Sequence, residues 1–170
     1  MAGMPSMTTI DDPSQLPAVS GAYALVIDLP DDVVLPIVSL GKPALRAGRY
    51  IYAGSANGPG GLKARLSRHL KAAKAIRWHV DYLTNIAGVY ELAAIPDGNE
   101  CQIVDALSTI EGVSIPHPGF GSSDCKACQS HFLAVPDDLG ANAVIEVLKT
   151  EGLFWRRHPA SCSWSPQPKP

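Results

Sequence analysis

The stretch GAYALVIDL, residues 21–29, is apolar apart from Asp28, and the turn signal Pro30-Asp31-Asp32 follows it. A run of this length and composition, closed by a turn, predicts a buried β-strand. Two further stretches, VVLPIVSL at residues 33–40 and RYIYA at residues 49–53, also have strand character, and Pro36 restricts the first to a sheet edge or a bulge. Short connections join the three stretches, so we expect a small three-stranded sheet.

Helical patterns follow the third strand. A glycine-rich loop at residues 57–61 leads into a predicted helix over residues 61–75, and residues 76–86 and 97–110 favour two more. We also expect a strand at 89–95, a Pro/Gly loop at 115–124, a short strand at 131–135 and a helix at 141–150. The sequence therefore predicts an α+β fold, with a small mixed or antiparallel three-stranded central sheet flanked by helices and an extra C-terminal strand and helix.

The length of 170 residues suits one domain with a proper core. We expect a disordered lead-in at residues 1–19, the domain at 20–136, a C-terminal helical extension at 137–158 and a flexible tail at 159–170. No apolar run approaches the ~20 residues that span a bilayer, so no membrane partner is expected. Four cysteines without a secretory signal favour a reducing cytoplasm.

Basic residues gather in one part of the sequence, although the formal net charge is −2. Residues 42–77 contain nine of the fourteen lysines and arginines and no aspartate or glutamate. A field of one sign attracts a polyanion such as DNA, although such patches also serve phosphate ligands or solubility. The candidate DNA-binding residues are Lys63, Arg68, Lys71, Lys74 and Arg77.

Two polar side chains lie at the margin of the apolar stripe on the helix predicted over residues 61–75. At about 100° per residue, His69 projects within the stripe that contains Leu62 and Leu66, and Arg65 lies at its edge. A guanidinium at the margin of a core needs a polar or anionic partner, which is either an internal carboxylate or a substrate phosphate.

Glu100 projects inward beside Val104 and Leu107 on the helix predicted over residues 97–110. Two interpretations stay open for this carboxylate. Asp97 and Glu100 have the spacing of an N-terminal capping box. A single inward carboxylate, assisted by waters and a substrate phosphate, is also a common way to hold Mg²⁺.

These residues together resemble the motifs of the GIY-YIG nucleases. Residues 21–23 (GAY) are similar to the Gly-Ile-Tyr element, and residues 52–54 (YAG) are similar to the Tyr-Ile-Gly element. Residues 61–69 (GLKARLSRH) resemble the family helix that carries an essential arginine, and Glu100 matches the metal-binding glutamate. The segments WHVDYL, EC, GFGSSDC and SHF, which begin at residues 78, 100, 119 and 130, resemble a subfamily found alone or fused to a helix-hairpin-helix DNA glycosylase of the endonuclease III type.

The resemblance implies a role for each of five side chains. Tyr23 would act as general base or proton relay, with its high pKa lowered by Arg65 or the metal. Arg65 would also hold the scissile phosphate, while Tyr52 and His69 would position water or phosphate. Glu100 would bind one Mg²⁺ or Mn²⁺.

The resemblance also implies an activity: metal-dependent hydrolysis of DNA phosphodiester bonds in DNA repair or processing, on branched or damaged DNA. Ser55, His79 and Asp81 are candidates for a supporting shell around the site, although for His79 and Asp81 the pattern slightly favours a packing or capping role. The alternatives are a non-catalytic nucleic-acid-binding module and a hydrolase of small phosphodiesters or nucleotides. No protein partner follows from the sequence.

The cysteines offer a separate candidate site. Cys125, Cys128 and His131 have spacings suited to a structural Zn²⁺, with Cys101 as a distant fourth ligand. Cysteines without a metal in a reduced loop are the alternative. The two cysteines of the loop stand one residue further apart than is usual in the subfamily, which leaves their role open.

Overall fold

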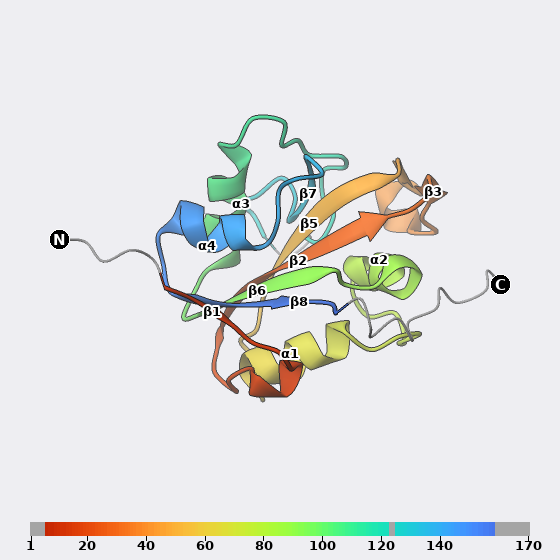
Figure 1. Ribbon diagram of the computed structural model, residues 1–170. Coiled ribbons are helices and arrows are strands. Elements are labelled where there is room, and N and C mark those ends of the chain that lie inside the picture. Colours follow the sequence, from red (N-terminus) through yellow and green to blue (C-terminus); the bar gives the residue numbers. More distant parts are fainter. Residues whose placement is uncertain (1–5, 123–124, 159–170) are drawn as a thin grey trace.

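The strand expected at residues 21–29 is an inner strand of the sheet. A computed structural model describes residues 6–122 and 125–158, which form an α+β domain with four α-helices and a six-stranded, mostly antiparallel sheet in the order β1-β8-β6-β2-β5-β7 (Figure 1). In chain order the strands are β1 (Met7–Thr9), β2 (Gly21–Leu29), β3 (Val33–Val34), β4 (Ala44–Leu45), β5 (Gly48–Ser55), β6 (Glu91–Pro96), β7 (Phe132–Val135) and β8 (Gly152–Arg156). The helices are α1 (Gly61–His69), α2 (His79–Ala87), α3 (Glu100–Ser108) and α4 (Asn142–Leu148), with short 3₁₀ turns at η1 (Pro13–Gln15) and η2 (Val38–Leu40).

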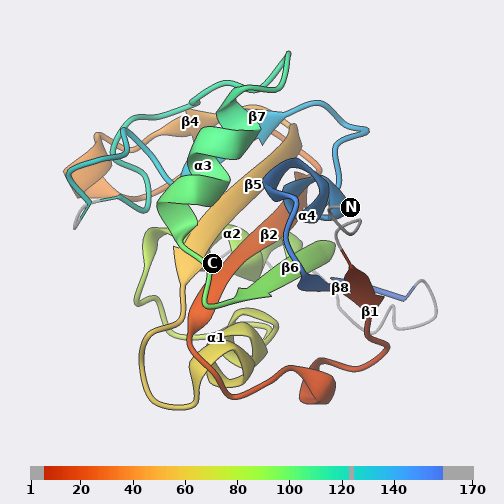
Figure 2. The same ribbon diagram turned by 90° about the vertical axis from the view of Figure 1, so that its left-hand side faces the viewer.

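The two faces of β2 enter two different cores, which explains why its sequence is apolar on both sides. Tyr23 and the odd-numbered positions after it join the core beneath α1 and α2, whereas Ala22 and the even-numbered positions up to Val26 join the core beneath α3 and α4. Successive side chains of a strand point to opposite faces, so a strand covered on both sides reads as one continuous apolar run. Figure 2 shows α3 and α4 in front of the sheet and α2 behind it.

The expected three-stranded sheet is wrong in size. The strand expected at 33–40 lies outside the sheet, while β6, β7 and the two short strands β1 and β8 join β2 and β5 to make six. β1 pairs in parallel with β8, Met7 opposite Gly152, and β8 pairs antiparallel with β6. The prediction of a disordered lead-in at 1–19 is therefore wrong for the described part of that segment, where Ile10 and Leu16 are buried. The extension at 137–158 likewise contains a strand as well as a helix. The tail at 159–170 and residues 1–5 lie outside the described residues.

The strand expected at 33–40 shrinks to Val33–Val34, which pairs with β4 in a separate two-stranded ribbon. Pro36 has no N–H group to donate to a neighbouring strand, and the chain continues into the 3₁₀ turn η2.

The first helix is shorter than expected. α1 ends at His69 rather than at residue 75, and Ala73 adopts a left-handed conformation with φ of 51°, which a continuing helix does not allow. α2 then begins at His79, where the Asp81 carboxylate accepts from the backbone N–H groups of Arg77 and Trp78.

The third helix begins three residues later than expected. The Asn99 side chain caps α3 by accepting from the backbone N–H of Cys101, at 2.8 Å, and of Gln102. Asp97 lies before the helix in a turn with φ of 60°. The capping box of Asp97 and Glu100 is therefore wrong, and Glu100 is the first residue of the helix. Among the described residues, no helix has both the length and the apolar character needed to cross a membrane.

The N-terminal segment should contribute measurably to stability. Leu16→Ala should lower the free energy of unfolding by about 2–5 kcal/mol, because the leucine side chain is buried in the core beneath α1 and α2. The control Val19→Ala, at an exposed side chain, should change it by less than about 0.5 kcal/mol. Denaturation followed by circular dichroism measures both, and a Leu16→Ala variant as stable as wild type would show that the segment does not pack on the domain.

Candidate active site

The pairing of β2 with β5 brings the two motif tyrosines together. Tyr23 lies opposite Gly54 and Leu25 lies opposite Tyr52, so both tyrosines share one face of the sheet. Their ring centroids are 6.5 Å apart.

Close steric contacts explain why the two motifs contain glycine at residues 21 and 54. A Cβ atom on Gly54 would collide with the Tyr23 hydroxyl, and a Cβ atom on Gly21 would collide with the backbone oxygen of Ile95. Glycine at both positions therefore lets a side chain and a neighbouring strand approach the backbone closely.

Tyr23 and His69 form a buried hydrogen-bonded pair. The Tyr23 hydroxyl lies 2.7 Å from His69 Nε2, and either group can donate, depending on the tautomer of the ring. Burial lowers the pKa of His69 to about 3, so the imidazole is neutral near physiological pH. His69 Nδ1 is buried and has no hydrogen-bond partner among the described residues, which leaves a polar atom available to a water or a ligand.

Arg65 lowers the pKa of Tyr23 as expected, but its effect is too small to bring that pKa below the ordinary value. Burial raises the pKa of Tyr23 well above its ordinary value, Tyr52 adds to the shift, and the positive charge of Arg65 offsets only part of it. Tyr23 is therefore a neutral phenol, and its direct partner is His69 rather than solvent.

A cleft of about 530 Å³ opens beside this pair. Four residues that the sequence predicted for catalysis, for Mg²⁺ binding or for their support line it: Tyr52, Ser55, Arg65 and Glu100. Burial raises the pKa of Tyr52 to about 12, so its hydroxyl is a protonated donor. The side chains in this wall combine one carboxylate with cationic and hydroxyl groups, which suits a hard metal ion together with a phosphate.

Arg65 meets an aromatic ring instead of an internal carboxylate. Its guanidinium lies 4.4 Å from the ring centroid of Trp78, and none of the described carboxylates forms an ion pair with it. The cation–π contact orients the guanidinium while leaving its N–H groups available to an anion. Trp78 also lines the cleft, and its role was missed at the sequence level, although a tryptophan immediately after Arg77 in a basic window was a signal.

Arg68 serves the fold rather than the expected DNA surface. Its guanidinium donates to both oxygens of Asp81, at 3.0 and 2.9 Å, and lies over the Trp78 ring. Burial opposes ionisation of Asp81, but the hydrogen bonds from Arg68 and the backbone outweigh it, so the pKa of that carboxyl lies below its ordinary value. Asp81 therefore acts as a cap and ion-pair partner rather than as a lining residue of the cleft.

The other predicted DNA-binding residues divide into two kinds. Lys63, Lys71 and Arg77 are exposed. Lys74 is partly buried, and its ammonium donates to the Lys71 carbonyl and the Asn85 side chain, so it differs from the expected free cation.

His79 takes a packing role beside the cleft. Its Nδ1 accepts from the backbone N–H of Gly121 at 3.1 Å, and its ring lies 5.5 Å from that of Phe120, centroid to centroid. The contact ties the start of α2 to the loop that forms the other wall of the cleft.

The predicted cysteine cluster is assembled. Ligand atoms of Cys101, Cys125, Cys128 and His131 all lie within 4.8 Å of one another, so this Cys₃His group could hold a metal ion. The backbone N–H groups of Cys128 and Ala127 hydrogen-bond to the Cys125 thiol and lower its pKa. Cys125 and His131 also line the cleft, as does Lys126 between the two loop cysteines, a cation that the sequence reasoning did not select.

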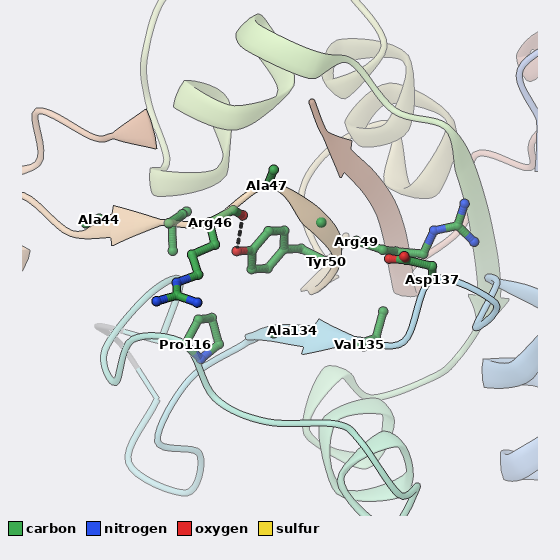
Figure 3. Close-up of a pocket in the computed structure, with 11 residues that line it drawn as sticks. Ala44, Arg46, Ala47, Arg49, Tyr50, Pro116, Ala134, Val135 and Asp137 are labelled. Atoms are coloured by element: carbon green, nitrogen blue, oxygen red, sulfur yellow. Dashed lines mark hydrogen bonds between the residues drawn. The ribbon is translucent and has the colours of Figure 1, made fainter. Parts of the chain in front are cut away.

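A second hollow, of about 440 Å³, lies at the other end of β5 (Figure 3). Much of its polar lining is already engaged: Arg49 pairs with Asp28 at 2.7 Å, and the Tyr50 hydroxyl donates to the Arg46 carbonyl at 2.6 Å. None of the catalytic or metal-binding residues predicted from the sequence lines it, so the functional argument rests on the cleft.

Comparison with known proteins gives one match. The family model described as a domain of unknown function, DUF123, matches residues 22–152. No curated protein and no solved structure matches the chain.

The ion pair of Arg68 with Asp81 should make stability depend on pH. Asp81→Asn should lower the free energy of unfolding by about 3–5 kcal/mol near neutral pH, because it breaks a buried ion pair. The folded pKa is depressed, so the contribution is present above the unfolded value of ~4 and disappears as pH falls through the folded value. The difference between wild type and variant in urea denaturation should therefore shrink in acid.

A matched control is Asp31→Asn at an exposed turn, which should change stability little at any pH. A difference for Asp81→Asn that stays constant as the solution becomes acid would contradict the ion-pair account.

Proposed function

The chain belongs to the DUF123 family, whose function is unknown, and we propose from its cleft that it is a metal-dependent phosphodiesterase that cleaves DNA. The observation that carries the proposal is the convergence of Tyr52, Arg65 and Glu100 on one cleft, from the three different elements β5, α1 and α3. The likeness of the two tyrosine motifs and of the α1 segment to those of the GIY-YIG nucleases supports the same reaction and the same core fold.

Glu100 is the proposed metal ligand. It is the first residue of α3, it faces the cleft, and it is the one carboxylate among the described residues that line the cleft. One carboxylate, completed by waters and substrate phosphate, matches the way Mg²⁺ or Mn²⁺ is commonly held. When bound, the ion would supply positive charge to the leaving oxygen.

Arg65 is the proposed phosphate clamp. Its guanidinium lies over the Trp78 ring, and a planar fork of N–H donors suits bidentate contact with phosphate oxygens. The interaction should strengthen as charge builds up on the phosphate in the transition state.

Tyr52 and the pair of Tyr23 with His69 are proposed to arrange the attacking water. The Tyr52 hydroxyl faces the cleft and stays protonated, so it donates to water or phosphate. Tyr23 and His69 lie behind it and act as a proton relay. Burial raises the pKa of Tyr23 and lowers that of His69, so both groups are neutral at rest. The phenol therefore passes its proton to Nε2 only when charge in the cleft brings the two pKa values closer together. This replaces the simpler picture of Tyr23 as a free base.

DNA is the proposed substrate because the exposed cations lie on and after α1, the helix that carries Arg65. Lys63, Lys71 and Arg77 are exposed on a segment without acidic residues. A nucleotide or other small phosphodiester would need only the cleft, so the surface cations distinguish a polymer substrate from a small one.

Catalysis should depend on Glu100 and Arg65. Glu100→Gln keeps the shape and removes the metal-binding charge, and Arg65→Ala removes the clamp, so each should lower Mg²⁺-dependent cleavage of labelled DNA by about 10²–10³, or roughly 3–4 kcal/mol. Both variants should bind DNA and melt nearly as wild type does.

Two controls sharpen that experiment. Asp105→Asn makes the same charge change as Glu100→Gln at an exposed position of α3 and should leave cleavage unchanged. Arg65→Lys keeps the charge and loses the bidentate fork, so partial loss is expected. Wild-type cleavage by both Glu100→Gln and Arg65→Ala would contradict the mechanism. Cleavage of small phosphodiesters without cleavage of DNA would show that the substrate is a small phosphodiester rather than DNA.

DNA affinity should fall steeply with salt, with a slope that reflects the number of phosphates the protein neutralises. Lys63→Glu/Lys71→Glu should weaken binding and flatten the slope by about one unit for every phosphate that the variant no longer neutralises. Lys149→Glu, at an exposed lysine on α4's C-terminal side, is the charge-matched control. Fluorescence anisotropy over a salt series measures the slope. Equal slopes for wild type and both variants would show that DNA binds to another surface of the protein.

A further inference from the structure

The Cys₃His group joins two segments that are remote in sequence. Cys101 lies in the first turn of α3, Cys125 and Cys128 lie in the loop before β7, and His131 directly precedes that strand. Cys101 Sγ is 3.5 Å from Cys125 Sγ and 3.9 Å from His131 Nε2. Their convergence depends on the sheet order β6-β2-β5-β7, because α3 follows the inner strand β6 and the loop leads into the edge strand β7.

We propose that this group binds one structural Zn²⁺ that fastens the first turn of α3 to the loop before β7 and so holds Glu100 in the wall of the cleft. The zinc site itself stands on the geometry of its four ligands. Its effect on Glu100 rests on the function proposed above.

The ligand set and its spacing select zinc. Three thiolates and one imidazole form a closed tetrahedral set for Zn²⁺, whereas Mg²⁺ prefers oxygen ligands. Zn–S bonds of about 2.3 Å in a tetrahedron place two sulfur atoms about 3.8 Å apart, and sulfur and nitrogen slightly closer. The distances of 3.5 and 3.9 Å are near those values, so little movement is needed.

A disulfide is the competing chemistry for two close thiols. The 3.5 Å between Cys101 Sγ and Cys125 Sγ is a non-bonded distance, well beyond the ~2.05 Å of a disulfide. A bond between them would also leave Cys128 and His131 without a purpose in the cluster.

Hydrogen bonds to the backbone of Cys101, Cys125 and His131 already hold these three residues in place. The Cys101 N–H donates to the Asn99 side chain, and the Cys125 N–H donates to the Ser122 carbonyl at 3.0 Å. His131 donates through its N–H to Phe120 and accepts through its carbonyl from Ala53 of β5. The zinc ion would add a direct link between these ligand residues, which hydrogen bonds to β5 and to the start of α3 already hold in place.

Several residues of the Cys₃His group and its neighbours also form one side of the cleft. Glu100 is the residue next to Cys101, and Cys125, Lys126 and His131 line the cleft with it. Fixing Cys101 against the loop therefore fixes the position of the Glu100 backbone and keeps Lys126 in the wall of the cleft.

The test begins with the metal content of full-length protein purified without metal-affinity resin. We expect one equivalent of zinc per chain by inductively coupled plasma mass spectrometry. Replacing it with Co²⁺ should give the visible absorption of a tetrahedral site and the near-ultraviolet charge-transfer bands of cobalt–thiolate bonds. Folded protein that holds no zinc and gives no such bands with Co²⁺, or a mass that shows a disulfide, would overturn the site.

Variants then assign the ligands. Cys125→Ser/Cys128→Ser should lose the zinc and melt at a lower temperature, and Cys162→Ser, at the cysteine outside the described residues, should keep one equivalent. If the double variant does not fold, the cobalt spectrum of the wild type still decides.

The positioning role has its own readout. Zinc-stripped protein that keeps its far-ultraviolet circular dichroism should bind Mn²⁺ at the Glu100 site at least ten-fold more weakly, and added zinc should restore the affinity. Unchanged Mn²⁺ affinity would limit zinc to stability and overturn the positioning claim. One zinc in a protein that binds no Mn²⁺ and cleaves nothing would instead refute the proposed function and leave the zinc site standing.

Discussion

The antiparallel register of β2 on β5 sets Tyr23 opposite Gly54, and the arrangement of the site follows from that pairing. The missing side chain of Gly54 gives the Tyr23 hydroxyl room to reach His69 on α1. A slip of one residue would turn one of the two motif tyrosines toward α3 and α4 and leave the other facing α1, so the two rings would lie on opposite faces of the sheet. The register therefore connects the packing of the core to the chemistry of the cleft.

The parts of the fold that local patterns control were predictable. The apolar run of β2 and the leucine stripe of α1 identified those elements, because strand and helix periods are written in neighbouring residues. The strands β1 and β8 were missed because each is short and gains its stability only from pairing with a partner that is distant in sequence. The cap of α3 was misassigned because Asp97 and Asn99 are both good caps, and only the backbone conformation distinguishes them.

The candidate site likewise contains some features that the sequence predicts and others that only the structure reveals. Arg65 and Glu100 were found because a charged residue beside an apolar stripe is visible in sequence, and the Cys₃His group was found because its residue types are rare. The pairing of Arg68 with Asp81 was not visible, since nothing in the sequence tells a guanidinium bound to an internal carboxylate from one that faces a ligand. The burial of Tyr23 was also hidden, and it leaves Tyr23 as a neutral phenol that is hydrogen-bonded to His69 rather than exposed to solvent.

The central claim is that Glu100 and Arg65 converge on one metal ion and one phosphate. It is tested most directly by a crystal structure of the protein with Mn²⁺ and a DNA duplex carrying phosphorothioate linkages that resist cleavage. The account predicts an anomalous manganese peak at bonding distance from the Glu100 carboxylate, with a backbone phosphate bound to that ion and hydrogen-bonded to Arg65. Manganese bound elsewhere, or DNA seated away from the cleft, would contradict it.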